Sequence, residues 1–129
     1  MIYLDTSALV KLARREAETE ALRAWLAENP RPLVASALVR TETARALRRS
    51  APEAVPALRS VLALVNQFPV SDAVLDAAAA LPDPGLRSLD AIHLATASMH
   101  ASLLTWFVAY DVRLAKSARA HGLPVATPS

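Results

Sequence analysis

The fold is decided by Met1-Ile2-Tyr3-Leu4-Asp5-Thr6-Ser7-Ala8-Leu9-Val10. Its first four residues are apolar and suit a buried strand, and the next three supply side-chain oxygens before a run with helical spacing. We therefore predict a strand that ends at Leu4, followed by a helix whose N-cap is Thr6 or Ser7. Asp5 then lies at the carboxyl edge of a sheet, where open α/β sheets bind ligands. A single junction of this kind is also explained by helix capping, so a functional interpretation needs more acids at that edge.

The composition is that of a globular chain. It has 129 residues, of which 53% are hydrophobic and 20% charged, and it contains no cysteine. This length suits a single domain spanning 1–129, and the absence of cysteine excludes disulfides and thiolate metal sites. An acid interrupts the N-terminal apolar run, so we expect no signal peptide and therefore a cytoplasmic protein. The most apolar later stretch, residues 88–110, carries an aspartate and two histidines and is a poor membrane span.

The basic residues are almost all arginine rather than lysine. The formal net charge is only +2, yet all but two of the 14 basic residues are arginine. Arginine binds phosphate through two parallel hydrogen bonds, so an arginine-rich surface is compatible with nucleic acid. A GC-rich coding bias would produce the same excess, and composition alone leaves both explanations open.

The rest of the chain alternates short apolar runs with longer amphipathic ones. The strands predicted after the first are Leu33–Ala35, Phe68–Val70, Leu103–Ala109 and Pro124–Ala126. The predicted helices are Ala8–Arg15, Glu16–Asn29, Ala37–Arg49, Ala57–Val65, Asp72–Leu81, Leu89–Ala101 and Val112–His121, with Ser36, Ser71, Ser88 and Asp111 as N-caps. This alternation predicts a small, largely parallel sheet with helices on both faces.

Four acids are expected at one edge of that sheet. Asp5 and Asp111 each follow a strand, and Glu42 lies near the start of a helix that begins at the same edge. Asp90 lies in the first turn of a helix that leads into a parallel strand, so it faces that edge too. The four carboxylates converge if the first, second and Leu103 strands are neighbours. The other eight acids fall on amphipathic helix faces or in loops.

Crowded carboxylates call for a cation. Several negative charges in a small space raise one another's pKa values unless a positive charge compensates, and helix N-termini supply only a fraction of a charge. Oxygen ligands without cysteine select a hard divalent ion such as Mg²⁺ or Mn²⁺. Such an ion activates water and neutralises phosphate charge. From these residues we infer metal-dependent hydrolysis of a phosphodiester bond, without a covalent enzyme intermediate.

The same residues resemble a known family. The chain is similar to PIN-domain ribonucleases and, more narrowly, to VapC-type toxins of bacterial toxin–antitoxin pairs. The segments that carry the resemblance are Leu4–Leu9, Glu42 between two threonines, Ser88–Ala97, Tyr110–Leu114 and the closing Gly122–Val125. The resemblance covers the full length and implies a PIN-like three-layer α/β/α sandwich with a small, mainly parallel sheet. It also implies an endoribonuclease that depends on Mg²⁺ or Mn²⁺.

The resemblance further implies roles for individual residues and for partners. Asp5, Glu42, Asp90 and Asp111 are expected to hold the metal and to position the attacking water. The family often has threonine or serine two residues before the last of these acids, where this chain has Ala109. We expect the missing hydroxyl to come from the Thr6-Ser7 pair, as a group that supports the metal ligands. The implied partners are an RNA substrate, a second copy of the chain in a homodimer, and an antitoxin whose segment lies across the site.

Several alternatives remain open from sequence. A catalytically weak or silent PIN module that acts as a scaffold is favoured only by Ala109. A phosphorylated receiver domain needs an acidic pair after the first strand, and a haloacid-dehalogenase-type phosphatase needs an acid where Ser7 stands. His93 is interpreted as a packed histidine or a support for the site rather than a metal ligand.

Two surface features are also ambiguous. The arginines that either form a rim guiding RNA or are simply solvated are Arg14, Arg15, Arg45, Arg48 and Arg49. Two apolar stripes are larger than a small core obviously requires, and one of them is expected to pack against a partner. The stripes are Leu22, Trp25 and Leu26, and Leu58, Val61, Leu62 and Val65.

Overall fold

The computed structural model describes all 129 residues and contains a five-stranded, all-parallel sheet of order β3-β2-β1-β4-β5. The strands are β1 (Ile2–Leu4), β2 (Leu33–Ser36), β3 (Val65–Phe68), β4 (Trp106–Val108) and β5 (Val125–Ala126). The helices are α1 (Thr6–Ala13), α2 (Thr19–Glu28), α3 (Val39–Ser50), α4 (Val55–Ala63), α5 (Asp72–Ala79), α6 (Ser88–Met99) and α7 (Val112–Ala120), with 3₁₀ turns η1 (Pro52–Ala54) and η2 (Ala101–Leu103). No helix combines the length and the apolar character that crossing a membrane requires.

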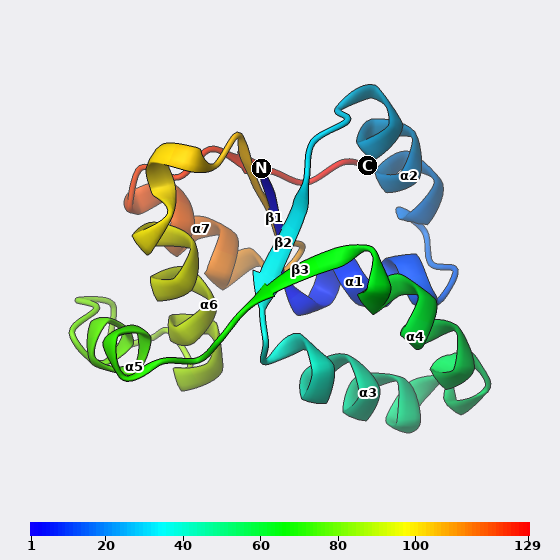
Figure 1. Ribbon diagram of the computed structural model, residues 1–129, viewed down its shortest axis with the longest axis horizontal. Helices are drawn as coiled ribbons and strands as arrows, with labels where there is room; N and C mark the ends of the chain where they lie inside the picture. Colours follow the sequence, from blue (N-terminus) through cyan, green and yellow to red (C-terminus); the bar gives the residue numbers. More distant parts are fainter.

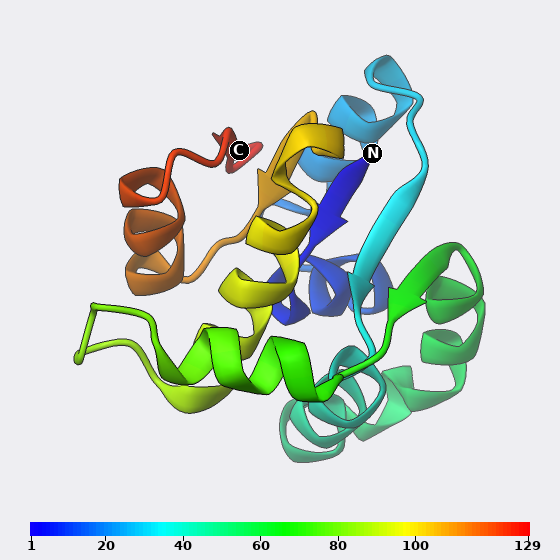
Figure 2. The ribbon, with the colours of Figure 1, turned by 60° about the vertical axis from the view of Figure 1, so that its left-hand side comes forward.

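The helices cover both faces of the sheet, which confirms the predicted α/β/α layers. Figure 1 shows α1 to α4 on one side of the strands and α5 to α7 on the other, and Figure 2 shows the same layers from a second side. The alternation of side chains along β1 explains this division. Ile2 and Leu4 join a core cluster with α1, α2 and α4, whereas Tyr3 joins the cluster beneath α6 and α7.

The strand order places the site. β1 pairs with β2 on one side and with β4 on the other, both in parallel. The predicted neighbourhood of the first, second and Leu103 strands is therefore confirmed, and the carboxyl ends of all three meet at one edge. The first residue of α1 follows β1 after a single residue, and α3 and α7 begin within a few residues of β2 and β4.

The helix caps differ from the prediction in three places. The N-cap of α1 is Asp5, not Thr6 or Ser7: its backbone is extended (φ −78°, ψ 177°) and its carboxylate accepts a hydrogen bond from the Ala8 amide. Both hydroxyl residues lie inside the helix, where they are free to contact the site. Ser88 is likewise the first helical residue of α6 rather than its cap, and α3 begins at Val39, beyond Ser36. The predicted caps at Ser71 and Asp111 are confirmed.

Two strand boundaries were also predicted wrongly. β3 occupies Val65–Phe68, whereas residue 65 was assigned to the preceding helix and the strand to residues 68–70. The apolar spacing of α4 continues into Val65, so periodicity alone does not reveal that this residue pairs with Leu33 of β2. β4 is shorter than predicted because Ala101–Leu103 forms the 3₁₀ turn η2, with the Leu103 side chain exposed.

The apolar stripes are mostly used within the core. Leu22, Leu58, Val61 and Val65 are buried, and the Trp25 ring packs edge-on against that of Trp106 with 6.0 Å between centroids. The sequence argument that these stripes exceed the needs of the core is therefore wrong for most of their residues.

Candidate active site

The four predicted acids lie at the carboxyl edge of the β2-β1-β4 part of the sheet. Asp5 follows β1 as the cap of α1, Asp111 caps α7 after β4, and Glu42 lies in the first turn of α3 after β2. Asp90 lies in the first turn of α6. Their charges act on one another: those of Asp111 and Glu42 raise the pKa of Asp90, and that of Asp90 raises the pKa of Asp5. The structure thus brings the four acids into one electrostatic neighbourhood.

Asp5 is the most buried of the four, with only 3% of its surface exposed. Its Oδ1 atom accepts hydrogen bonds from the Ser7 hydroxyl at 2.6 Å and from the Ala8 amide at 2.9 Å. Burial raises the pKa of the Asp5 carboxyl to about 6, although both hydrogen bonds and the charge of His93 oppose the rise. A carboxylate in this position gains a great deal from a nearby cation.

Ser7 connects the two junctions that carry aspartates. Its hydroxyl donates to Asp5 and accepts a hydrogen bond from the Tyr110 amide at 2.9 Å, which ties the β1–α1 junction to the β4–α7 junction. Thr6 has a parallel role, because its hydroxyl donates to Oε1 of Glu42 at 2.7 Å. Ala109 is fully buried in the apolar cluster beneath α6 and α7. The hydroxyls that contact the carboxylates therefore come from the Thr6-Ser7 pair.

Glu42 is held by a buried hydrogen-bond chain that sequence analysis did not predict. Its Oε1 atom lies 2.6 Å from Nε2 of His93, whose Nδ1 lies 2.8 Å from the Tyr3 hydroxyl. The Ser36 amide donates to the same hydroxyl at 3.1 Å, so the tyrosine oxygen is held from β2 as well as from α6. His93 is 1% exposed and acts as a support for the site, as its sequence position suggested.

This chain also sets the charge state of Glu42. Burial acts to raise the pKa of the Glu42 carboxyl, but the hydrogen bond and charge of His93, together with the Thr6 hydroxyl, outweigh it and hold the pKa below its ordinary value. Burial raises the pKa of the Tyr3 hydroxyl well above its ordinary value, so this group stays protonated. One signal in the sequence was available: a tyrosine buried in a central strand requires a hydrogen-bond partner.

Asp90 and Asp111 are less constrained. Asp111 is exposed, and its Oδ1 atom accepts a hydrogen bond from the Leu114 amide at 2.9 Å. The Asp90 side chain is half-buried and receives no hydrogen bond from the chain. Its pKa is raised, first by burial and then by the charges of Asp111 and Glu42, while His93 and Arg87 act in the opposite direction.

The donor set fits a hard divalent cation. Asp5, Glu42 and Asp111 each use one carboxylate oxygen for hydrogen bonds within the chain, and Asp90 uses neither. Every one of the four thus keeps an oxygen without a protein donor, and oxygens in mutually repelling carboxylates suit Mg²⁺ or Mn²⁺. As the side chains stand, no three acids or histidines are already arranged around one ion position. Binding would therefore require side chains, above all the unrestrained Asp90, to turn toward the ion.

Comparison with known proteins gives a consistent set of relatives. The family model described as the PIN domain matches residues 2–120. The chain is 49% identical to Ribonuclease VapC35 of Mycobacterium tuberculosis, with 99% of this chain and 97% of the relative covered. It is 45% identical to Ribonuclease VapC46 of the same species, with 99% and 98% covered.

Solved structures share the fold at lower sequence identity. The toxin VapC20 of Mycobacterium tuberculosis superposes with a TM-score of 0.77 at 20% identity, covering 99% of this chain and all of that one. A chain of a toxin–antitoxin complex from Klebsiella pneumoniae gives a TM-score of 0.74 at 23% identity, covering 100% and 98%. At these identities the likeness establishes the three-layer architecture.

Proposed function

This chain belongs to the PIN-domain family, among relatives named as VapC ribonucleases, and on that premise we propose that it is a metal-dependent endoribonuclease. It acts as the toxin of a toxin–antitoxin pair. The observation that carries the proposal is the meeting of four carboxylates at one sheet edge, each with an oxygen free of protein donors. The family match nearly spans the chain, and we propose that residues 1–129 form one PIN-like domain.

We assign roles to the four acids from their surroundings. Asp5 and Asp90 are the principal metal ligands, because burial and like charge raise the pKa values of both. Asp111 offers its second oxygen from the start of α7, and Glu42 is held in its ionised form by His93. When bound, Mg²⁺ or Mn²⁺ supplies charge neutralisation at the phosphate and lowers the pKa of water. Thr6 and Ser7 keep their two carboxylates oriented.

The partners follow from the same premise. The substrate is cellular RNA, so we place the activity in the cytoplasm. An antitoxin protein inhibits the enzyme, as a toxin–antitoxin pair requires. We also propose a homodimer; the apolar surface that remains for an interface includes the exposed side chain of Leu64 beside a cavity of about 450 Å³ between α1, α2 and α4. Size-exclusion chromatography with light scattering tests the dimer, and a monomer at high concentration discards it.

The central experiment compares the wild type with Asp5→Asn. Purified protein is incubated with total RNA in the presence of Mg²⁺ or Mn²⁺, and in parallel with EDTA. We expect fragmentation only by the wild type and only with metal. Induced expression of both forms, with growth and RNA integrity followed, provides the cellular version. A wild type that leaves both RNA and growth intact would favour the silent scaffold module instead.

A further inference from the structure

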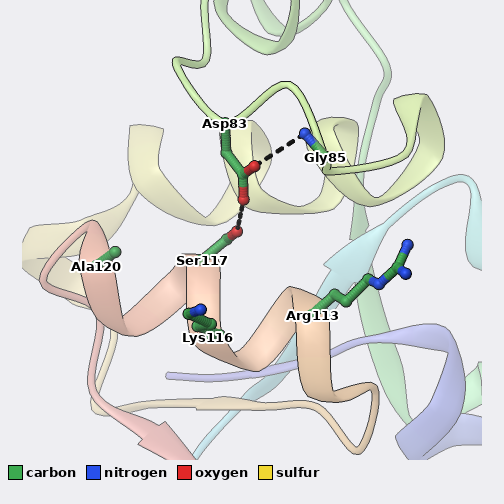
Figure 3. Close-up of a pocket in the computed structure, with 6 residues that line it drawn as sticks. All are labelled: Asp83, Gly85, Arg113, Lys116, Ser117 and Ala120. Carbon is green, nitrogen blue, oxygen red and sulfur yellow. Dashed lines mark hydrogen bonds between the residues drawn. The ribbon is translucent and has the colours of Figure 1, made fainter.

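Two of the pockets that carry basic residues differ in where they lie, because only one of them places its arginines beside a predicted metal ligand. The first lies along α7 and is lined by Asp83, Gly85, Arg113, Lys116, Ser117 and Ala120 (Figure 3). Its acid is already used: Asp83 accepts hydrogen bonds from the Ser117 hydroxyl at 2.5 Å and from the Gly85 amide at 3.0 Å. The bond between Asp83 and Ser117 therefore joins the loop before α6 to helix α7.

The second pocket opens beside the predicted metal ligands. It has a volume of about 320 Å³ and lies between α3 and the start of α6, lined by Thr6, Thr41, Glu42, Arg45, Ala46, Arg49 and Leu89. Thr6 directly follows one carboxylate in sequence and Leu89 directly precedes another, while Glu42 is itself one of the four. The pocket is therefore an extension of the catalytic edge toward α3.

Its two arginines form no ion pair within the protein. Arg45 and Arg49 are one turn apart on the same face of α3, where like charges repel. Neither makes an ion pair, whereas Arg15 pairs with Glu20 and Arg14 donates to the Ser50 hydroxyl. Two such cations at a pocket wall can bind an external anion.

The carboxylate inside the pocket does not supply that anion. Oε1 of Glu42 is engaged by Thr6 and by His93, and no ion pair joins Glu42 to either arginine. The candidate rim of five arginines is thus divided by the fold. Arg45 and Arg49 line the pocket, while Arg48, between them in sequence, does not.

We propose that Arg45 and Arg49 form a subsite for an RNA backbone phosphate next to the one that is cleaved. This inference rests on the proposed ribonuclease function. It also gives the path of the bound strand, which runs from the four carboxylates across α3. The planar guanidinium groups suit a phosphate because each offers parallel N–H donors. Leu89, 48% exposed at the pocket wall, offers apolar surface to the adjoining ribose or base.

The test measures binding apart from cleavage. A short fluorescein-labelled single-stranded RNA of mixed sequence is titrated with protein in EDTA, and its anisotropy is followed at several salt concentrations. We expect Arg45→Ala and Arg49→Ala each to weaken binding by about tenfold. The double variant should lower the slope of log affinity against log salt by about 0.7, the value for one lost phosphate contact on a single strand.

Arg48→Ala is the matched control, because it removes the same charge from the same helix outside the pocket. It should leave both affinity and slope unchanged, and Arg45→Lys should retain the slope while losing part of the affinity. Equal losses in Arg48→Ala and Arg45→Ala would overturn the subsite, since the effect would then be one of general charge. So would a double variant that binds RNA like the wild type.

Two further measurements separate the possible failures. Cleavage of RNA by the wild type tests the proposed function alone, so an active wild type with unaffected pocket variants refutes only the subsite. A titration with polyglutamate tests a protein partner: binding as tight as that of RNA, with the same dependence on Arg45 and Arg49, would assign the pocket to protein carboxylates and overturn the proposal. Manganese affinity measured by calorimetry should be the same in all arginine variants.

Discussion

The two halves of the carboxylate edge are built differently. On the side of β1 and β2, Asp5 and Glu42 are fixed by hydroxyl, amide and imidazole donors. On the side of β4, Asp111 accepts only its capping bond and Asp90 accepts none. One half is thus oriented before any ligand arrives, and the other half is free to turn. We infer that the fixed half sets the geometry and that the free half closes around the ion.

The largest effect is expected from Asp5→Asn. RNA cleavage should fall by more than about a hundredfold, the upper end for residues that only support a metal ligand. The fold itself should become more stable in EDTA, because the asparagine side chain still caps α1 but carries no buried charge. The pKa of Asp5 rises from 3.8 to about 6 on folding, which corresponds to a cost on the order of 3 kcal/mol at neutral pH.

The pH dependence of the unfolding free energy tests whether the buried Asp5 carboxylate destabilises the fold. The folded chain holds the Asp5 proton more tightly than the unfolded chain, so this residue's contribution to unfolding free energy is greatest below the unfolded pKa. That contribution is lost as the pH rises through about 6. Urea unfolding should therefore show a smaller loss of stability between about pH 4 and about pH 7.5 in Asp5→Asn than in the wild type. Asp76→Asn, on the exposed face of α5, is the control and should match the wild type.

The fixed half can be broken at His93. His93→Ala removes the ring between Tyr3 and Glu42, leaving a cavity and two polar groups without partners. We expect a loss of about 2–4 kcal/mol in unfolding free energy and a drop in cleavage rate of about 10–100-fold. Chemical denaturation and an RNA cleavage assay measure the two effects. His121→Ala, at the exposed C-terminal end of α7, should change neither; a wild-type cleavage rate in His93→Ala would show that Glu42 needs no positioning.

Metal affinity sharpens the comparison between the halves. In Asp90→Asn, Mn²⁺ binding measured by calorimetry should weaken by about 10–100-fold, because the freest carboxylate is lost. In Glu42→Gln the loss should stay below about tenfold, since one oxygen of this group is already committed to Thr6 and His93. An affinity in Asp90→Asn equal to that of the wild type would count heavily against the shared ion. Equal losses in both variants would remove the distinction between a fixed and a free half.

The smallest effect is expected at Ser7. Ser7→Ala removes the donor to Asp5 and the acceptor of the Tyr110 amide, at a cost of about 1 kcal/mol in unfolding free energy. Because the Ser7 hydrogen bond lowers the pKa of Asp5, that pKa should rise further in the variant, as carboxyl titration by NMR would record. Ser102→Ala, at an exposed serine of η2, serves as the comparison. An unchanged Asp5 titration would show that Ser7 serves the Tyr110 amide alone.

The carboxylate edge was predictable because it follows from connectivity. In a parallel sheet the residues after strands and the N-termini of flanking helices share one edge, so the positions of Asp5, Asp90 and Asp111 follow once the strands are recognised. The division of the arginines was not within reach, since residue 48 lies three residues after 45, the same helical spacing that joins 42 and 45, and only the pocket lining separates them.

The supporting contacts were not predictable in the same way. The bond between Tyr3 and His93 joins residues 90 positions apart and depends on the depth at which α6 packs against β1. Propensity likewise places the start of β3 too late, because Val65 fits the helical stripe of α4 as well as it fits a strand. The choice is made by pairing with β2, which is information from outside the segment.

The chain of hydrogen bonds from Ser36 through Tyr3 and His93 to Glu42 has an evolutionary consequence. Its residues come from β2, β1, α6 and α3, so a substitution at any one of them disturbs contacts between separate elements. Loss of the tyrosine hydroxyl leaves the imidazole without one of its hydrogen-bond partners, and loss of the imidazole does the same to the hydroxyl. We expect lineages that drift at Tyr3 to have drifted at His93 as well, so that the two positions covary as a pair.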